Sequence, residues 1–420
     1  MNSWVIEKEE KTFLRELAKK QLEYSQLPIM KEREKKWYEH NDLKGEVPMI
    51  HFETETFENE IIPDLKCTSE AARAIEKRIY KAILNHEMIG DDRIVSPWFD
   101  ICWDIHFQLF DLEVKQEYSK DGMNRQIGHR FVHPVSDLHD DRHLIKPSVF
   151  SVDRERTLKW KAFVEDIFGD ILLVRLNMSA LTACLSQKIV HFMGMETMIY
   201  AMVDYPDEFH WMIDRMSKDY ISLFKWMEKE KLLVLNNGNS FVGNGTFGFT
   251  NDLPKPDFSQ EKGVRTTDVW GFMDSQETVS ISPDMFGEFF FPYYNEVAKS
   301  FGLLSYGCCE PVHGIWEKYL CRLPNLRKVS ISPWCNEEYM GQALKNSTVI
   351  YHRKPSPNFV GVGKELDEAA FNEHLLKTIH CARGCKLEFS FRDVYTLGGN
   401  IEKPRRAVQI LRELIEKHWR

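Results

Sequence analysis

The sequence lacks the features of membrane and secreted proteins. No uninterrupted apolar run approaches the roughly 20 residues needed to cross a bilayer, and residues 1–11 have no apolar core of the kind found in secretory signals. Collagen-like, disordered and low-complexity biases are also absent. We therefore expect a soluble cytoplasmic protein with no membrane partner.

A surplus of basic residues and a disulfide framework are missing too. The chain has 55 Lys and Arg against 64 Asp and Glu, a net charge of −9, so nucleic acid is not an expected partner. Its nine cysteines are an odd number without close regular spacings, which favours reduced thiols. With 420 residues, 43% of them apolar, the chain can bury a large core.

Short apolar runs alternate with amphipathic helical patterns along the chain. The runs predict strands at 47–52, 93–99, 170–176, 268–273, 302–306, 326–331, 347–351 and 386–391. The helical patterns cover 7–40, 69–85, 207–230, 283–300, 337–344, 365–383 and 403–419. Eight strand–helix units indicate an α/β fold, a closed (β/α)8 TIM barrel, with an open doubly wound sheet as the alternative.

The barrel is expected to carry one extension and two insertions. Residues 1–45 are predicted as an N-terminal helical extension, and 46–420 as a single barrel domain. The strand–helix alternation breaks at about 101–150 and again at 232–265. The second break is rich in Gly and Asn over 235–248, so we expect a long loop that covers the barrel mouth.

Active sites of such barrels lie at the carboxyl ends of the strands, so the polar residues that follow each run are the candidates. The catalytic candidates are Asp100, Asp274, Glu277 and Glu310. The substrate-binding candidates are Trp98, Trp270, Tyr306, His313, Arg353, Asp393 and Tyr395. Paired carboxylates can divide acid and base work because like charge raises one pKa. Simple ion pairing with Arg353 or Arg392 is the alternative for each carboxylate.

Residues 302–313 form an apolar strand that runs into two adjacent thiols, a carboxylate and an imidazole. Cys308, Cys309 and Glu310 combine soft and hard ligands, which suits Zn²⁺ better than a disulfide. The alternative is a pair of small buried apolar side chains.

Residues 270–294, which begin Trp-Gly-Phe-Met-Asp-Ser and end Phe-Pro-Tyr-Tyr, resemble a signature of the uroporphyrinogen decarboxylase superfamily. Residues 93–101 resemble the family's second strand, and residues from 198 onward resemble its helix after the third strand. The resemblance extends from about 45 to the end and is strongest over 266–320. It implies a (β/α)8 barrel that serves either decarboxylation or zinc-dependent methyl transfer to or from a corrinoid.

Three regions of the sequence separate these activities. True decarboxylases carry an arginine-rich N-terminal motif, whereas residues 51–57 here contain no arginine. The methyltransferases carry His-x-Cys after the fifth strand, which corresponds to 306–308, so Cys308 matches a zinc ligand and Tyr306 replaces the histidine. Their second cysteine corresponds to the region 392–396, which has none. Zinc bound by Cys308 would need Cys309, Glu310, Glu277 or Asp393 as further ligands.

The resemblance therefore implies a corrinoid-dependent methyltransferase that demethylates a small methoxylated compound. Zinc would act as a Lewis acid on the ether oxygen, and a corrinoid carried by a partner protein would accept the methyl group. Asp274 or Asp100 would orient the substrate, with tryptophans stacked on it. The alternatives are a metal-free decarboxylase of a small carboxylated substrate and a non-catalytic binding protein. A homodimer is also left open.

Overall fold

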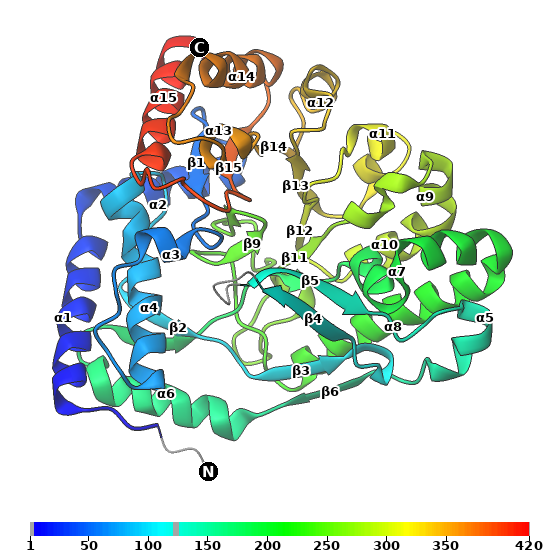
Figure 1. Cartoon of the computed structure of the whole chain (residues 1–420), viewed down its shortest axis with the longest axis horizontal. Coiled ribbons are helices and arrows are strands. Elements are labelled where there is room, and N and C mark those ends of the chain that lie inside the picture. The colour runs from blue at the N-terminus through cyan, green and yellow to red at the C-terminus, as the bar shows by residue number, and fades with distance from the viewer. Residues whose placement is uncertain (1–3, 121–125, 420) are drawn as a thin grey trace.

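A curved sheet of seven parallel strands organises the fold, with helices arranged around it (Figure 1). This computed structural model describes residues 4–120 and 126–419. The sheet order is β1-β15-β14-β13-β12-β11-β8. Its strands are β1 (Met49–Phe52), β8 (Leu181–Thr182), β11 (Trp270–Met273), β12 (Leu303–Tyr306), β13 (Leu326–Ile331), β14 (Ile350–Arg353) and β15 (Leu387–Phe391).

The predicted barrel does not close. β2 (Trp98–Ile101) and β7 (Leu173–Leu176) form a separate parallel pair. Among the described residues, neither β1 with β2 nor β7 with β8 is joined by ladder hydrogen bonds. The strand order is that of a TIM barrel, but the structure shows an α/β fold whose barrel is open at two seams. This corrects the expectation of a closed barrel.

Every predicted strand is present, although the second begins at Trp98 rather than Arg93. Predicted helices are confirmed as α4 (Glu70–Leu84), α8 (Pro206–Lys229), α12 (Glu337–Ala343), α14 (Glu368–Cys381) and α15 (Lys403–His418). The helix expected over 283–300 is two helices, α9 (Pro283–Phe289) and α10 (Phe291–Ala298). Ser282 caps α9 as its sequence suggests, accepting a hydrogen bond from the Met285 N–H. The pattern missed α6 (Arg154–Phe168) and α7 (Leu185–Asp204).

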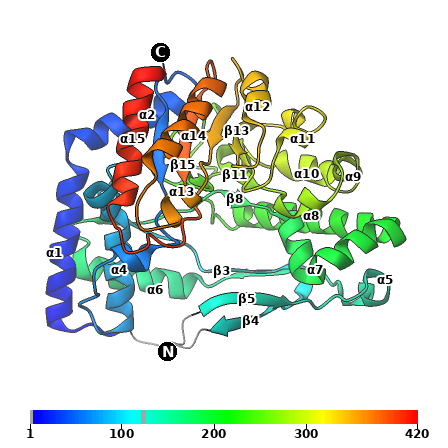
Figure 2. The same cartoon turned by 45° about the horizontal axis from the view of Figure 1, so that its top comes forward.

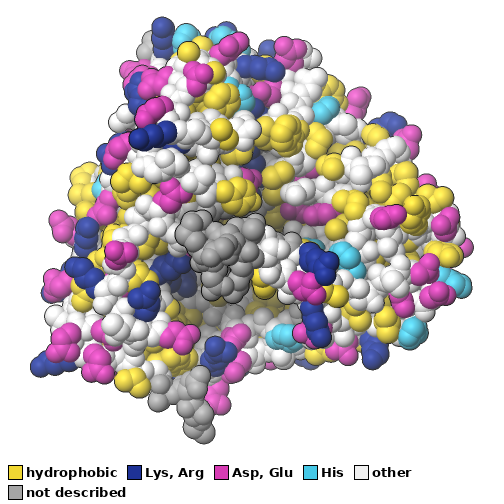
Figure 3. Space-filling view, viewed as in Figure 1, with side chains coloured by type: hydrophobic (Ala, Val, Ile, Leu, Met, Phe, Trp, Pro, Cys, Tyr) yellow, Lys and Arg dark blue, Asp and Glu magenta, His cyan; other side chains and the backbone are white. Residues whose placement is uncertain are grey.

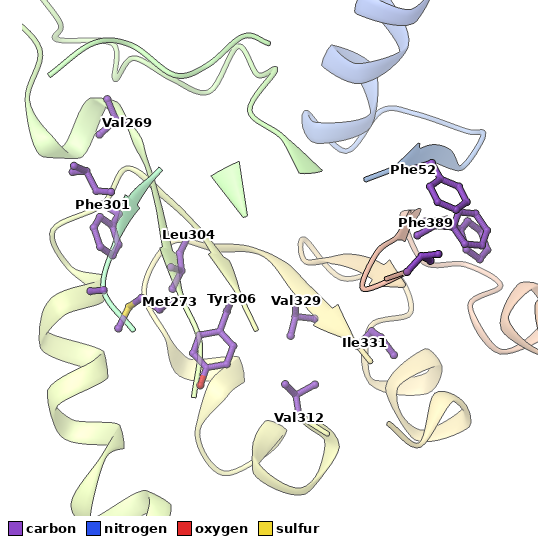
Figure 4. Close-up of a cluster of buried hydrophobic side chains, with 14 of the residues drawn as sticks. Phe52, Val269, Met273, Phe301, Leu304, Tyr306, Val312, Val329, Ile331 and Phe389 are labelled. Atoms are coloured by element: carbon purple, nitrogen blue, oxygen red, sulfur yellow. The ribbon is translucent and has the colours of Figure 1, made fainter. Parts of the chain in front are cut away.

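Side chains of the main sheet alternate between an apolar outer face and a polar inner face. Figure 4 shows Leu304, Tyr306, Val329 and Ile331 on neighbouring strands of the outer, apolar face. The inner face carries buried polar side chains: His51, Ser305, Lys328, Ser330, His352, Glu388 and Ser390. Buried polar groups need partners, and a segment from elsewhere in the chain supplies several of them.

The hairpin of β9 (Phe241–Gly243) and β10 (Thr246–Phe247) enters the barrel and meets this polar face. Lys328 Nζ donates to Thr246 Oγ1 at 2.6 Å, and Ser390 Oγ donates to the Gly245 carbonyl at 2.6 Å. At Gly243 a Cβ would lie 2.5 Å from Ser305 Oγ, so the approach requires glycine. The segment expected over the barrel mouth therefore lies inside the barrel, because its glycines permit close packing against the strands.

The N-terminal helices α1 (Lys8–Ser25) and α2 (Pro28–Asn41) confirm the predicted helical region. α2 packs on the amino end of the barrel: His40 Nε2 lies 3.1 Å from Glu388 Oε2, and Asn41 Nδ2 donates to the Phe247 carbonyl at 2.9 Å. The boundary at residue 45 stays a prediction.

The first insertion forms two antiparallel pairs beneath the main sheet in Figure 2. β3 (Ile105–Gln108) pairs with β6 (Val149–Val152), and β4 (Lys115–Lys120) pairs with β5 (Gln126–Val132). The remaining short α-helices are α3 (Glu58–Ile61), α5 (Leu138–Asp141), α11 (His313–Trp316) and α13 (Asn358–Gly361). In the described ranges, no helix is long and apolar enough to cross a membrane.

Candidate active site

A cluster of thiols, carboxylates and cations forms where the strands of the main sheet end. Gly307 follows β12 with φ +98, a conformation that favours glycine. This turn places Cys308, Cys309 and Glu310 directly after the strand. The predicted residues at the ends of β11, β12 and β15 meet here.

Glu310 fixes the geometry of the cluster. Its Oε1 accepts from the Ser275 N–H at 2.9 Å, and its Oε2 accepts from the Cys308 N–H at 2.7 Å. The side chain is only 3% exposed. Glu310 thus ties the end of β11 to the end of β12, and both of its oxygens are already engaged.

The two adjacent thiols are chemically different. Cys308 Sγ lies 3.6 Å from Cys309 Sγ, and Cys309 Sγ lies 3.5 Å from Asp393 Oδ2. The hydrogen bond from Cys309, helped by the charges of Lys354 and Arg392, lowers the pKa of Cys308 to about 7. The same hydrogen bond and burial raise the pKa of Cys309. One thiol is therefore ready to ionise near neutral pH, and its neighbour stays protonated.

Two cations flank the Cys308 thiolate. Lys354 Nζ, in a side chain only 2% exposed, donates to the Cys308 carbonyl at 3.1 Å. Arg392 Nη1 lies 3.9 Å from Cys308 Sγ, and Arg392 Nε lies 3.0 Å from Glu53 Oε2. Burial lowers the pKa of Lys354, against the opposing charge of Cys308. The ends of β1, β14 and β15 thereby join those of β11 and β12.

Asp274, directly after β11, is a buried carboxyl group without a strong partner. It is 6% exposed, and its Oδ1 accepts no hydrogen bond from the part of the chain that the structure describes. Burial, then the negative charges of Glu310, Cys308 and Glu277, raise the pKa of Asp274 well above its usual value. A carboxyl group in this setting is biased toward its protonated form.

Glu277 and α10 support the acid from the other side. Ser186 Oγ donates to Glu277 Oε2 at 2.7 Å, and the Tyr294 hydroxyl donates to the Asp274 carbonyl at 2.7 Å. Burial raises the pKa of Glu277 as well. The cluster thus holds two carboxyl groups biased toward the protonated form beside one acidic thiol.

The predicted metal ligands do not fit zinc as they lie. In the residues described, no group of three or more His, Cys, Asp or Glu side chains could hold a metal ion. Both oxygens of Glu310 accept backbone N–H groups. The positive charge beside Cys308 comes from Lys354 and Arg392. Zinc itself stays a prediction, without an assembled set of ligands.

Asp100 and Trp98 lie apart from this cluster, on the separate β2–β7 pair. Asp100 accepts from Arg175 Nε at 2.8 Å and from Asn177 Nδ2 at 2.9 Å. The Arg175 guanidinium stacks 3.8 Å from the centre of the Trp98 ring. Asp100 therefore forms an ion pair, but with Arg175 and not with Arg353 or Arg392, the partners that the sequence suggested.

Two other predicted residues are structural as placed. Trp270 is fully buried at the start of β11 and donates from Nε1 to the Gly248 carbonyl at 2.8 Å. Arg353 points to the outer face of β14, where Arg353 Nη2 lies 3.0 Å from Glu337 Oε1. Trp270 cannot contact a substrate in this position because it is fully buried. Arg353 cannot, because alternation along the strand sends its side chain to the outer face.

The remaining predicted residues lie at the margin. The buried Tyr306 hydroxyl donates to Ser275 Oγ at 2.6 Å and so supports the cluster from behind. His313 Nδ1 accepts from the Asn336 N–H at 3.3 Å. Tyr395 is 74% exposed. Substrate binding by His313 and Tyr395 stays a prediction.

The sequence reasoning gave no role to several residues that complete the cluster. Lys354 directly follows β14, so its position after a strand was an available signal. Ser186 and Tyr294 lie on helices, and no pattern in the sequence links them to Asp274 or Glu277.

No protein-family model matches this chain, and no curated protein is similar to it. One similar solved structure is described as a methyltransferase from Methanosarcina mazei. It shares 11% sequence identity with a TM-score of 0.49, over 91% of this chain and 98% of that chain. Likeness at this level carries no argument about the chemistry here, which therefore depends on the residues of the site.

Proposed function

We propose that this chain is a methyltransferase that removes the methyl group from a small methoxylated compound. In this proposal a corrinoid carried by a partner protein accepts the methyl group. The resemblance of residues 270–294 supports the reaction class, and the cluster at the ends of β11 and β12 supports the chemistry.

The observation that carries the proposal is the buried Asp274 carboxyl group with its raised pKa. Cleaving a methyl ether leaves an electron pair on the oxygen, and an alkoxide or phenoxide is a poor leaving group unless it is stabilised. Zinc was expected to supply that stabilisation. Because the ligands for zinc are not assembled, a neutral Asp274 that donates its proton to the leaving oxygen would do the same work.

In the proposed step the proton comes from this chain and the methyl acceptor comes from the partner protein. The bond between oxygen and the methyl carbon breaks, its electron pair stays on oxygen, and the Asp274 proton moves to that oxygen. A corrinoid held by a docked carrier protein would supply the nucleophile that accepts the methyl group. Burial and the negative charge of Glu310 keep the proton on Asp274 until the step occurs, because both oppose ionisation of Asp274.

Cys308 also affects the protonation of Asp274. Its thiolate raises the pKa of Asp274, while Lys354 and Arg392 stabilise the thiolate itself. Ionisation of Cys308 near pH 7 therefore helps Asp274 to keep its proton at the pH where the enzyme would work. The two cations also keep the net charge of a cluster with several carboxylates from becoming strongly negative.

A metal-free decarboxylase is the second candidate, and the same cations favour it. Lys354 and Arg392 could hold a substrate carboxylate, and Asp274 could protonate the carbanion left when CO2 departs. This reaction does not require a methyl group or a corrinoid.

A product assay separates the two reactions. Purified protein is incubated with free cob(I)alamin and a panel of methoxylated and carboxylated benzenes, and both phenol and CO2 are measured. Phenol that forms only with cob(I)alamin supports the methyltransferase. CO2 release without cob(I)alamin, with no phenol, contradicts it and supports the decarboxylase.

A further inference from the structure

We propose that the open seam between β1 and β2 binds a small aromatic carboxylate. The inference rests on the proposed function only where it names this molecule as the substrate. The substrate is then a methoxylated aromatic acid. The binding itself depends on the cavity alone.

The seam opens into a cavity of about 600 Å3. Its walls come from α4, from β2, from the segment after β7 and from the hairpin inside the barrel. Ligand pockets have volumes of about 300–1,000 Å3, so the space suits a substituted single ring. Figure 3 shows a hollow near the centre of this face, with Lys and Arg side chains over the region of α4 on its left.

The cavity offers aromatic walls to a ring. Phe241 and Phe247 of the inner hairpin line it, and Trp98 and Phe99 line it from β2. These side chains come from segments far apart in the sequence. Aromatic rings favour offset or edge contacts with another ring, each worth about 0.5–1.5 kcal/mol beyond area burial.

Most charges in the cavity are already paired. Lys77 Nζ lies 2.5 Å from Glu58 Oε1, and Lys81 Nζ lies 2.7 Å from Glu58 Oε2. Asp100 is paired with Arg175 at 2.8 Å. Glu58 balances only one of the two lysines, so these groups add one net positive charge to the wall of the cavity.

Two guanidinium groups remain, opposed by the single carboxylate of Glu55. Arg78 stacks 5.1 Å from the centre of the Phe99 ring and has no carboxylate partner within the described residues. Arg93 Nη1 donates to Asn85 Oδ1 at 3.0 Å, and its guanidinium lies 5.4 Å from the centre of the Phe241 ring. Both stand beside an aromatic wall, and guanidinium groups bind carboxylates in a planar, two-point geometry.

The polar side chains that line the cavity form hydrogen bonds with one another. Asn239 Nδ2 donates to Ser96 Oγ at 2.7 Å, and Ser240 Oγ donates to Asn177 Oδ1 at 3.0 Å. They hold the shape of the cavity and leave the recognition of charge to Arg78 and Arg93.

The segment after β1 connects this cavity to the candidate active site. Glu55 lines the cavity, and Glu53, two residues earlier, pairs with Arg392, whose Nη1 lies 3.9 Å from Cys308 Sγ. Burial alone would raise the pKa of Glu55, but the charges of Arg93, His51 and Lys81 lower it. One short segment therefore extends from the wall of the cavity to the Arg392 that flanks Cys308.

Isothermal titration of the purified chain with 4-methoxybenzoate tests the inference. Neutral 4-methoxybenzyl alcohol and ringless acetate are the comparison ligands. We expect 4-methoxybenzoate to bind at least about tenfold more tightly than either, a difference of about 1.4 kcal/mol. Arg78→Gln should remove most of this preference without changing binding of the alcohol. Arg78 is exposed, so this variant should fold.

Lys36→Gln is the matched control, since it removes one exposed positive charge on α2, away from the cavity. Equal binding of acid and alcohol, no binding of 4-methoxybenzoate, or equal loss in both variants would overturn the inference. Tight, Arg78-dependent binding without any turnover would support the cavity and count against the methyltransferase. Turnover of neutral methoxybenzenes without a preference for acids would support the methyltransferase and count against the carboxylate site in the cavity.

Discussion

Cys308 Sγ and Cys309 Sγ lie 3.6 Å apart at the end of β12, and the pKa values of these two adjacent thiols move in opposite directions. A shared hydrogen bond stabilises the thiolate of Cys308 and makes ionisation of Cys309 less favourable. The pair is therefore one acidic thiol with a built-in donor, and it faces Lys354 and Arg392 on its other side.

Alkylation should reveal this asymmetry. A thiol reacts as its thiolate, so the rate of Cys308 alkylation by iodoacetamide should rise with pH around a midpoint near 7. An ordinary cysteine has its midpoint at about 8.5. Cys309→Ser weakens the donor and should move the Cys308 midpoint upward. Peptide mass spectrometry measures the rate at each cysteine, with the exposed Cys321 as internal reference. A shared midpoint for Cys308 and Cys321 would contradict the assignment.

Zinc analysis addresses the ligand set. Since both oxygens of Glu310 are engaged and cations flank Cys308, protein supplied with Zn²⁺ and then desalted should retain far less than one zinc per chain. The small amount retained should be the same in Cys308→Ser. One zinc per chain that is lost in this variant would restore the zinc-dependent mechanism implied by the sequence.

Arg353 should matter for stability and not for substrate binding. Its guanidinium is fully buried, with Nη2 3.0 Å from Glu337 Oε1. Arg353→Met leaves Glu337 without its cation, which for buried pairs costs about 3–5 kcal/mol in the free energy of unfolding. Urea unfolding measures the loss, and Lys318→Met, which breaks the exposed pair with Asp284, should cost less than about 1 kcal/mol. Similar losses in the two variants would refute the structural role.

Asp274 should make stability depend on pH. A carboxyl group with a raised folded-state pKa adds stability when protonated and loses it as pH rises through that pKa. Asp274→Asn removes this titration, so the variant should become more stable relative to the wild-type protein between pH 5 and alkaline pH. Melting temperatures across this range give the measurement. A constant difference at all pH values would mean that Asp274 does not titrate in the folded protein.

Much of the fold followed from local pattern. All eight predicted strands exist because each is an apolar run bounded by turn residues, and the helical pattern over 283–300 begins at the first residue of α9. Closure of the barrel could not be predicted, since it depends on ladder hydrogen bonds between β1 and β2 that local sequence does not encode. The Gly-rich segment looked like a surface loop, but its glycines serve close packing inside the barrel.

The site residues were predictable where an ionisable side chain directly follows a strand. Asp274, Cys308, Cys309, Glu310 and Asp393 meet as expected, because parallel strands end at one edge. Arg353 could not be separated from Lys354 without the register of β14, since neighbours on a strand point to opposite faces. Contacts of Ser186 and Tyr294 arise from helix packing and leave no trace in the local sequence.

Single-turnover demethylation of 4-methoxybenzoate with free cob(I)alamin is the decisive test of Asp274 as the acid in methyl transfer. The account predicts 4-hydroxybenzoate and methylcobalamin in equal amounts from the wild-type protein. It predicts a rate at least about 100-fold lower in Asp274→Asn, the lower limit for loss of a general acid, and an unchanged rate in Cys321→Ser. An Asp274→Asn variant that demethylates as fast as the wild-type protein would contradict the account.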